Sequence, residues 1–221
     1  MVSISISDEF RNLWPEVQLA CISCDVSMLE KSDGLWKKIN EWSTEIRSSL
    51  KMEEVSQIPA IASSRKAYRA LGKDPARYRL SAEALMRRVI KGNDLYQINN
   101  VVDVVNLASV KSGFSIGGYD LDNIEGAIKL GVGKTDEPYE GIGRGELNIE
   151  SLPVLRDSLG AFGSPTSDSL RTSVTMHTKK FLMVYFGFGA YNELNKAVDF
   201  SISLLADFAN AQNIEQFTIG G

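Results

Sequence analysis

The sequence has 221 residues, of which 43% are hydrophobic and 24% are charged, a composition typical of globular domains and unlike collagen, coiled coils or disordered chains. A chain of this length buries about 70% of its unfolded surface, so it needs no metal or disulfide to fold. The net charge of −4 argues against a uniformly basic nucleic-acid-binding protein. No run approaches 18 apolar residues and the N-terminus lacks the features of a secretory signal, so we expect a cytoplasmic protein without a membrane span.

The first third of the chain alternates strand and helix patterns. β-branched residues and period-2 alternation predict strands over 2–6 and 17–26. Apolar residues at helical spacing predict an amphipathic helix over 29–51. Another helix is expected over 64–71, because Gly72 and Pro75 stop it there.

The next two helices have recognisable ends. Ser81 is expected to cap a helix over 82–91, and Gly92 suits the position just beyond its last turn. Valines at helical spacing predict a helix within 98–112 that ends at Gly113.

The last third is predicted to contain a central strand and a long helix. A glycine-rich stretch over 114–160 includes short strand-like pieces, and the apolar run 181–188 is predicted to be a central strand. Asn192 is expected to cap the final helix, whose buried stripe comprises Leu194, Val198, Ile202, Leu205 and Phe208. We therefore predict one α+β domain over 1–221, with a mixed β-sheet and packed helices.

Cys21 and Cys24 are the only cysteines, and they form a C-x-x-C within a predicted strand. A spacing of three puts the two thiols on opposite faces of a strand. The pattern therefore favours two reduced thiols over a redox pair.

Three familiar kinds of catalytic or cofactor site are disfavoured. The GVGKT run at 131–135 has Ile128 where a phosphate-binding loop needs glycine, so no nucleotide cofactor is expected. His177 is the only histidine, and its setting between threonines favours a structural or surface role. Any hydrolysis would therefore proceed without a histidine base, and we expect no metal site and no cofactor.

Positive charge is concentrated in residues 65–91. This basic segment contains nine basic and two acidic residues, a net charge of +7, whereas the rest of the chain has 15 basic and 26 acidic residues, a net charge of −11. Such a segment suits contact with a phosphate backbone, and it equally suits two solvated helix faces.

A run of short polar side chains occupies 163–175. Asp168 and Arg171 lie within it, and the apolar strand over 181–188 follows. Such a run either lines a ligand pocket or forms an exposed loop with local side-chain caps. The pocket interpretation predicts that Asp168, Arg171 and Asn100 face one cavity.

Several segments together resemble the B3/B4 domain of the bacterial phenylalanyl-tRNA synthetase β subunit, and especially its free-standing relatives. The similar segments are Ile98–Asn106 (INNVVDVVN), Gly117–Asp122 (GGYDLD), Gly126–Ile128, and the runs 67–92 and 167–175. They cover about residues 65–190. The resemblance implies an α+β B3/B4 fold.

In the synthetase this domain is the editing module, which hydrolyses tyrosine wrongly esterified to the phenylalanine tRNA. The resemblance therefore implies an aminoacyl-tRNA deacylase acting in trans, with a tRNA aminoacylated at its 3′ end as partner. The synthetase histidine before the shared Asp-Leu-Asp is replaced here by the neighbourhood Ser115–Gly118.

The resemblance also implies site residues. Asn100, Gly117 and Gly118 are candidates for positioning water and the oxyanion, and the substrate-binding candidates are Asn99, Glu146, Asp168, Arg171 and Thr172. The charge of the basic segment, and not the resemblance, supplies the candidate tRNA contacts, which are Arg65, Lys66, Arg69, Arg77, Arg79, Arg87, Arg88 and Lys91.

Two other functions are compatible with the same residues. One is a non-catalytic module that binds tRNA or a free amino acid, which the missing histidine favours. The other is a hydrolase of a small amino-acid derivative that uses no RNA.

Overall fold

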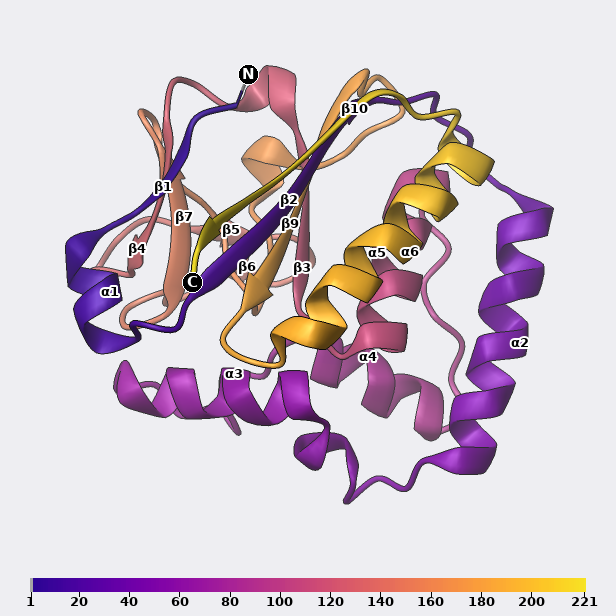
Figure 1. Cartoon of the computed structure of the whole chain (residues 1–221), viewed down its shortest axis with the longest axis horizontal. Helices are drawn as coiled ribbons and strands as arrows, with labels where there is room; N and C mark the ends of the chain where they lie inside the picture. The colour runs from indigo at the N-terminus through magenta and orange to yellow at the C-terminus, as the bar shows by residue number, and fades with distance from the viewer. Residues whose placement is uncertain (1) are drawn as a thin grey trace.

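Two four-stranded β-sheets and a layer of helices form the computed structural model of the chain, which describes residues 2–221. One sheet contains β1, β4, β7 and β8, and the other contains β10, β2, β9 and β3 (Figure 1). We call these the first and second sheets. The second sheet lies between the first sheet and helices α5 (Asn100–Ser112) and α6 (Tyr191–Ala209).

The first sheet is mixed. Its order is β1 (Ile4–Ile6), β4 (Ile128–Val132), β7 (Pro153–Asp157) and β8 (Gly160–Gly163). β1 and β4 are parallel, whereas the β4–β7 and β7–β8 pairs are antiparallel. The mixed pairing predicted from the sequence is confirmed in this sheet.

The second sheet is antiparallel throughout. Its order is β10 (Gln212–Gly220), β2 (Gln18–Asp25), β9 (Lys180–Gly187) and β3 (Ile116–Asp120), so β3 and β10 are edge strands. A separate two-stranded hairpin consists of β5 (Glu140–Gly141) and β6 (Gly145–Glu146). Its turn, residues 142–144, contributes to the lining of a cavity.

The helices are α1 (Asp8–Leu13), α2 (Asp33–Ser49), α3 (Pro59–Ala70), α4 (Ser81–Ile90), α5 (Asn100–Ser112) and α6 (Tyr191–Ala209). Short 3₁₀ turns occupy Val55–Gln57, Leu121–Asn123 and Leu170–Thr172. None of the helices in the described part of the chain is long and apolar enough to cross a membrane.

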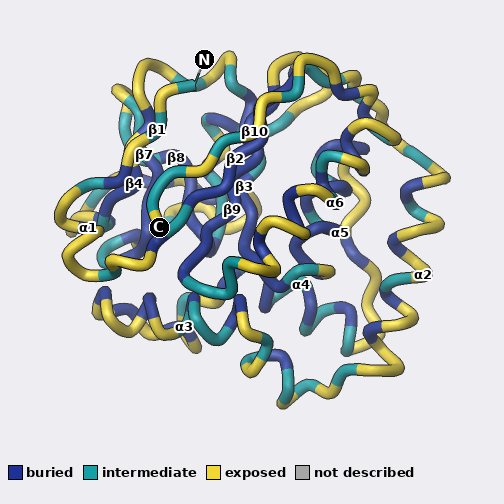
Figure 2. The backbone as a smooth tube through the Cα atoms, in the orientation of Figure 1, coloured by how far each residue is buried: buried dark blue, intermediate teal, exposed yellow. Residues whose placement is uncertain are grey.

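The two faces of the second sheet belong to two separate hydrophobic cores. Cys21 packs in the core between the sheets, whereas Cys24 packs in the core against the helices, as strand alternation predicts. Burial raises the pKa of both thiols to about 12, so they stay protonated at neutral pH. β9 is buried from Phe181 to Gly187, which agrees with the predicted central strand (Figure 2).

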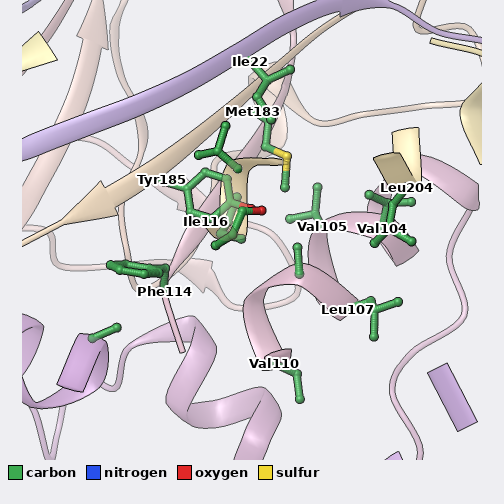
Figure 3. Packing of buried hydrophobic residues seen from close by; sticks show 14 of the residues in the cluster. Ile22, Val104, Val105, Leu107, Val110, Phe114, Ile116, Met183, Tyr185 and Leu204 are labelled. Carbon is green, nitrogen blue, oxygen red and sulfur yellow. The ribbon is translucent and has the colours of Figure 1, made fainter. Parts of the chain in front are cut away.

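Helix α5 lies at the centre of the helical core. Val104, Val105 and Val110 pack with Ile116 of β3 and Tyr185 of β9 in one buried cluster (Figure 3). Most residues of α5 are buried, because α4, α6 and β3 surround it. Val105 and Ile116 also form part of a cavity wall.

Two predicted caps are wrong. Ser81 is the first residue of α4 and Leu80 holds the N-cap position, because the Ser81 N–H donates to the Pro165 carbonyl, 2.8 Å away. The N-cap of α6 is Ala190, in the left-handed conformation at φ 60°, so Asn192 lies inside the helix. The predicted glycine positions after α4 and α5 are correct, since Gly92 and Gly113 have φ of 83° and 78°.

Candidate ligand-binding site

A cavity of about 730 Å³ lies where α4, α5, β3, the β5–β6 turn and the segment 164–168 meet. Each helix contributes one face, at positions i, i+3, i+4 and i+7: Ser81, Ala84, Leu85 and Arg88 from α4, and Val102, Val105, Asn106 and Ser109 from α5. The remaining lining residues are Tyr96, Ile98, Ile116, Gly118, Ile142, Gly143, Arg144, Ser164, Thr166, Ser167, Asp168 and Val174. Half of the lining residues thus carry polar or charged side chains, and the other half are apolar or glycine.

One end of the cavity lies beside the first residues of β3. The Ala82 N–H donates to Ser115 Oγ at 3.5 Å, which holds the N-terminus of α4 against the residue that precedes β3. The Ser81 N–H bond to Pro165 ties the same end to the 164–168 segment. The two bonds fix the N-terminus of α4 against β3 and the 164–168 segment.

The other end opens to solvent and is aromatic and cationic. Tyr96 and Ile98 are each 55% exposed, and Ile142 is 45% exposed across the opening. The Arg88 guanidinium lies 3.9 Å from the centre of the Tyr96 ring, and its Nη1 donates to the Tyr96 hydroxyl at 3.0 Å. Exposed apolar and aromatic side chains gathered at a cavity mouth are typical of a binding site.

Asp168 is the only carboxylate in the cavity lining. Its Oδ1 accepts a hydrogen bond from the Tyr119 hydroxyl at 2.7 Å, and its Oδ2 accepts one from the Gly118 N–H at 3.3 Å. Burial raises the pKa of Asp168 to about 7, against the opposing effect of these two hydrogen bonds. Protonated and ionised forms therefore coexist at neutral pH, and a cationic ligand group favours the ionised form.

Two glycines make room for the hydroxyl that holds Asp168. A Cβ at Gly117 would lie 1.9 Å from the Tyr119 hydroxyl oxygen, and one at Gly163 would lie 2.2 Å from it. Such distances are far below van der Waals contact, so neither position accepts a side chain while Tyr119 keeps this place. Gly117 does not line the cavity, and its part in the site is to leave this space.

Three polar side chains of the lining, those of Ser81, Asn106 and Arg144, form no hydrogen bond or ion pair with residues 2–221. The Ser81 hydroxyl is buried without a hydrogen bond. The Asn106 carboxamide is half-buried and has no hydrogen-bond partner among residues 2–221. By contrast, the Ser109 hydroxyl donates to the Phe114 carbonyl at 2.7 Å. The Ser81 hydroxyl is closed to solvent, whereas the Asn106 carboxamide reaches solvent and offers a donor and an acceptor at the cavity wall.

Asn99 and Asn100 have structural roles instead of the predicted ones. Asn99 Oδ1 caps α5 by accepting from the Val102 N–H at 2.9 Å. Asn100 is fully buried; its Oδ1 accepts from the Leu29 N–H, and its Nδ2 donates to two carbonyls, including that of Phe208. Neither residue lines the cavity, so the prediction that Asn100 shares a cavity with Asp168 and Arg171 is wrong.

The remaining predicted substrate contacts also lie elsewhere. Arg171 forms a bidentate pair with Asp157, at 3.0 and 2.8 Å, which anchors the 3₁₀ turn to β7. Thr172 is buried outside the cavity lining, and Glu146 is exposed on β6. Of the predicted catalytic and substrate residues, only Gly118 and Asp168 line the cavity.

The basic segment divides into paired and exposed cations. Arg65 and Arg87 both pair with the buried Glu83, at 2.8 and 2.9 Å, because a buried carboxylate needs a counter-charge. Arg65 and Arg87 are thus engaged within the protein, contrary to the prediction that they contact RNA. Arg88 lies at the cavity mouth, and the exposed cations are Lys66, Arg69, Arg77, Arg79 and Lys91.

Several lining residues were missed at the sequence level. Asn106 lies in the segment Ile98–Asn106 that carries the resemblance, and it is one of two polar residues, with Ser109, on the α5 face that lines the cavity. Arg144 and Ile142 lie in a glycine-rich turn that sequence alone describes only as flexible. Within residues 2–221, no three His, Cys, Asp or Glu side chains are grouped as metal ligands, and the exposed His177 lies outside the cavity.

Comparison with known proteins identifies the family. A family model for the B3/4 domain matches residues 63–210, which includes every residue of the cavity lining. The chain belongs to the B3/4 domain family. The resemblance inferred from the sequence is therefore confirmed.

Solved structures support the same fold. Among 17 matching chains is an N-terminal fragment of the phenylalanyl-tRNA synthetase β subunit from Pyrococcus horikoshii, with a TM-score of 0.51 and 14% sequence identity. The alignment covers 98% of this B3/4 protein and 54% of that fragment, so the chain spans about half the fragment's length. This likeness confirms the α+β fold. A search of curated proteins found no match.

Proposed function

We propose that this B3/4 protein is an aminoacyl-tRNA deacylase that acts in trans on mischarged tRNA. The observation that carries the proposal is the cavity itself, which joins an apolar wall, one carboxylate and a mouth bearing Arg88, Arg144 and Tyr96. These are the groups that an aminoacylated RNA end requires. The apolar wall accommodates an amino-acid side chain, Asp168 binds its α-ammonium, and the mouth receives the terminal nucleotide.

The size and the mouth of the cavity support this assignment. Pockets of about 300–1,000 Å³ enclose ligands of drug size, and the cavity of about 730 Å³ falls within that range. Proteins bind single-stranded RNA ends by stacking bases on aromatic rings and by pairing phosphates with arginine. Tyr96 supplies an exposed ring, and Arg88 and Arg144 supply the cations.

Hydrolysis of an aminoacyl-tRNA ester requires little catalytic assistance from the site. Water attacks the carbonyl carbon of the ester, the bond to the ribose oxygen breaks, and that oxygen takes a proton, releasing free amino acid and tRNA. A tRNA ester is already reactive, so holding the carbonyl and the water in line provides much of the acceleration. Asp168 fixes the α-ammonium for this alignment. Gly118, whose N–H is engaged by Asp168, supports that carboxylate and does not face the oxyanion.

Contacts with the rest of the tRNA are assigned to the exposed cations of the basic segment. These are Lys66, Arg69, Arg77, Arg79 and Lys91, which carry positive charge on an otherwise acidic chain. Contact with phosphates at these positions would contribute a salt-dependent, sequence-independent part of the affinity.

The proposal is tested by incubating the protein with a panel of tRNAs, each charged with one correct or one incorrect amino acid. We expect at least one mischarged tRNA to lose its amino acid faster than in buffer, and the Asp168→Ala variant to slow that loss. Heat-denatured protein is the blank. If every ester survives as long as in buffer, the chain is not a deacylase.

A non-catalytic binding module is the second candidate. It is favoured by a specific feature, because the Asn100 carboxamide and the Gly118 N–H are both engaged within the protein and the only histidine, His177, does not line the cavity. Saturable binding of aminoacyl-tRNA without turnover across the whole panel would establish this alternative.

A further inference from the structure

Three buried tyrosines form hydrogen bonds with three consecutive residues of one cavity wall. We call residues 166–168 the wall segment, and all three of its residues line the cavity. The phenol hydroxyls bond to one residue each: Tyr68 to the Thr166 hydroxyl at 3.0 Å, Tyr139 to the Ser167 carbonyl at 2.6 Å, and Tyr119 to Asp168 Oδ1 at 2.7 Å. Every residue of the wall segment is therefore held by a different phenol.

The three tyrosines reach the wall segment from both hydrophobic cores. Tyr68 of α3 and Tyr139, which precedes β5, belong to the core that contains the helices, whereas Tyr119 of β3 belongs to the core between the sheets. Tyr68 and Tyr119 are fully buried, and Tyr139 is 5% exposed. Since side chains in close-packed cores have little freedom, the three hydroxyls have fixed positions. The wall segment is therefore fixed relative to both cores.

Only one placement of the wall segment satisfies all of these hydroxyls. A buried phenol hydroxyl that loses its partner bears the full cost of its desolvation, so a shift of the wall segment is unfavourable. Ser164 restricts the segment further. Its hydroxyl accepts from the Thr166 and Ser167 N–H groups at 3.3 and 3.1 Å and donates to the Ser167 carbonyl at 2.9 Å.

Tyr119 differs from the other two tyrosines because its acceptor is a carboxylate. A hydrogen bond to a carboxylate favours the ionised form, so this bond opposes the burial that raises the pKa of Asp168 to about 7. The phenol itself stays neutral, since burial holds the pKa of Tyr119 well above its ordinary value. The other charged groups of the lining are Arg88 of α4 and Arg144 of the β5–β6 turn, and the neutral phenol of Tyr139 also lies near Asp168. Tyr119 therefore affects the charge of Asp168 as well as its position.

We propose that Tyr68, Tyr119 and Tyr139 are positioning residues, which hold the wall segment in place and orient the Asp168 carboxylate toward the cationic group of the ligand. This inference rests on the proposed function, in that the cavity receives the α-ammonium of an aminoacyl group, but it does not require that the ester be hydrolysed. None of the three tyrosines lines the cavity, so they act through the wall segment. A group held in its bound geometry binds a ligand more tightly than one that must be ordered on binding. Loss of a phenol hydroxyl therefore weakens binding without removing a ligand contact.

Replacing each tyrosine by phenylalanine removes the hydroxyl and keeps the ring. The three variants are Tyr68→Phe, Tyr119→Phe and Tyr139→Phe. Tyr185→Phe is the matched control, because Tyr185 is also fully buried and its hydroxyl bonds to the Ala197 carbonyl and the Ser201 hydroxyl, outside the cavity. Thermal melts establish that all four variants are folded at the temperature of the measurements.

The first measurement is the affinity for two stable probes. One is 3′-amino-3′-deoxyadenosine acylated with leucine, and the other is the same nucleoside acylated with 4-methylpentanoic acid, which lacks only the α-ammonium. By titration calorimetry at pH 7 we expect the wild type to bind the leucyl probe at least about tenfold tighter, because Asp168 pairs with the ammonium. Tyr119→Phe should reduce this ratio to below about threefold, and Tyr68→Phe and Tyr139→Phe should each weaken the leucyl probe by at least about threefold. Tyr185→Phe should change neither.

The second measurement follows the Asp168 carboxyl group without any ligand. Carboxyl ¹³C NMR gives its titration midpoint, and the signal is assigned by its absence in Asp168→Asn. We expect Tyr119→Phe to raise the midpoint, because a hydrogen bond that favours the ionised form is lost. The other three phenylalanine variants should leave the midpoint at the wild-type value. A role limited to stability would move none of the four.

The results separate this inference from the proposed function. Wild-type affinity in the three variants overturns the inference, as does an equal loss in Tyr185→Phe or an Asp168 midpoint that Tyr119→Phe does not move. A wild type that does not bind the leucyl probe also overturns it, because Asp168 then has no ammonium to meet. The expected pattern in a protein that hydrolyses no ester supports the inference and refutes the deacylase. Deacylation at the same rate in all four variants overturns the inference and leaves the deacylase in place.

Discussion

The Tyr119 hydroxyl donates a 2.7 Å hydrogen bond to Asp168 Oδ1, and this bond joins the core between the two sheets to the ligand cavity. The Tyr119 ring packs edge-on against Phe162 at 5.0 Å between ring centres, so the hydroxyl has a fixed position. The cavity carboxylate is therefore held by a side chain that is itself locked by packing. Such support is what a binding site needs for reproducible geometry.

Removing that hydroxyl tests its part in holding Asp168. We expect Tyr119→Phe to lower the free energy of unfolding by about 1.5–3 kcal/mol, because a hydrogen bond to an ionised group is lost. Tyr68→Phe is the control, since the Tyr68 hydroxyl pairs with the neutral Thr166 hydroxyl at 3.0 Å, and about 0.5–1.5 kcal/mol is expected there. Urea unfolding at pH 8 measures both, and equal losses would contradict a charged acceptor.

The space that Gly163 leaves for Tyr119 makes a second prediction. Gly163→Ala places a methyl group on the phenol, and overpacking of this kind costs about 1–3 kcal/mol. Gly34→Ala is the comparison, because Gly34 lies inside α2 and its added Cβ meets only the edge of the Phe208 ring at 3.3 Å. Thermal melts should show a clear loss for Gly163→Ala alone, and a wild-type melting temperature in that variant would refute the crowding.

Some cations of the basic segment are exposed and others are ion-paired, so substituting the first kind should change RNA affinity and substituting the second kind should change stability. Arg77→Gln together with Arg79→Gln should leave stability within about 0.5 kcal/mol and reduce the log–log salt slope of tRNA binding by one to two units. Arg87→Gln should instead lower stability by about 1–3 kcal/mol, because Glu83 loses a partner and is left partly unpaired. Filter binding between 50 and 300 mM salt, with urea unfolding in parallel, checks both outcomes. A slope that changes only in Arg87→Gln would reverse the assignment.

The raised pKa of Asp168 predicts how stability depends on pH. Between the ordinary pKa of 3.8 and about 7, the folded chain holds a proton that the unfolded chain has released. Its contribution to the free energy of unfolding therefore falls as pH rises through that window, by at most about 1.4 kcal/mol per pH unit, and is constant above it. Asp168→Asn should lose this component, so its stability should depend less steeply on pH between 4 and 7. Parallel profiles for the two proteins would rule out the raised pKa.

Sequence patterns predicted the buried elements well and the exposed ones poorly. β2, β9 and α5 are buried on most sides, so their apolar periodicity reflects their packing directly. β10 was not predicted, because it is an edge strand with a largely exposed, polar sequence that is ordered by pairing with β2. The caps of α4 and α6 depend on tertiary contacts, such as that between Ser81 and Pro165, which local sequence does not reveal.

The site was predictable only in part for a similar reason. Asp168 was identified from a polar run, but its partner Tyr119 lies 49 positions earlier in the chain. Asn100 is the first residue of α5 and lies in a segment that resembles the synthetase domain. Nothing in the local sequence indicates that its carboxamide forms hydrogen bonds with Leu29 and Phe208. Ser81 and Asn106 line one cavity only because α4 and α5 lie on either side of it.

Filling the cavity tests whether the ester is hydrolysed there. Ala84 lines the α4 wall, and Ala84→Phe extends a ring into the space proposed for the aminoacyl group. The measurement is the single-turnover rate of deacylation of the best mischarged tRNA, with tRNA affinity and the thermal melt recorded for the same variant. We expect a loss of rate of at least a hundredfold in a folded protein that still binds tRNA through its exposed cations. An undiminished rate in the folded Ala84→Phe variant would show that the ester is hydrolysed elsewhere and would contradict the account.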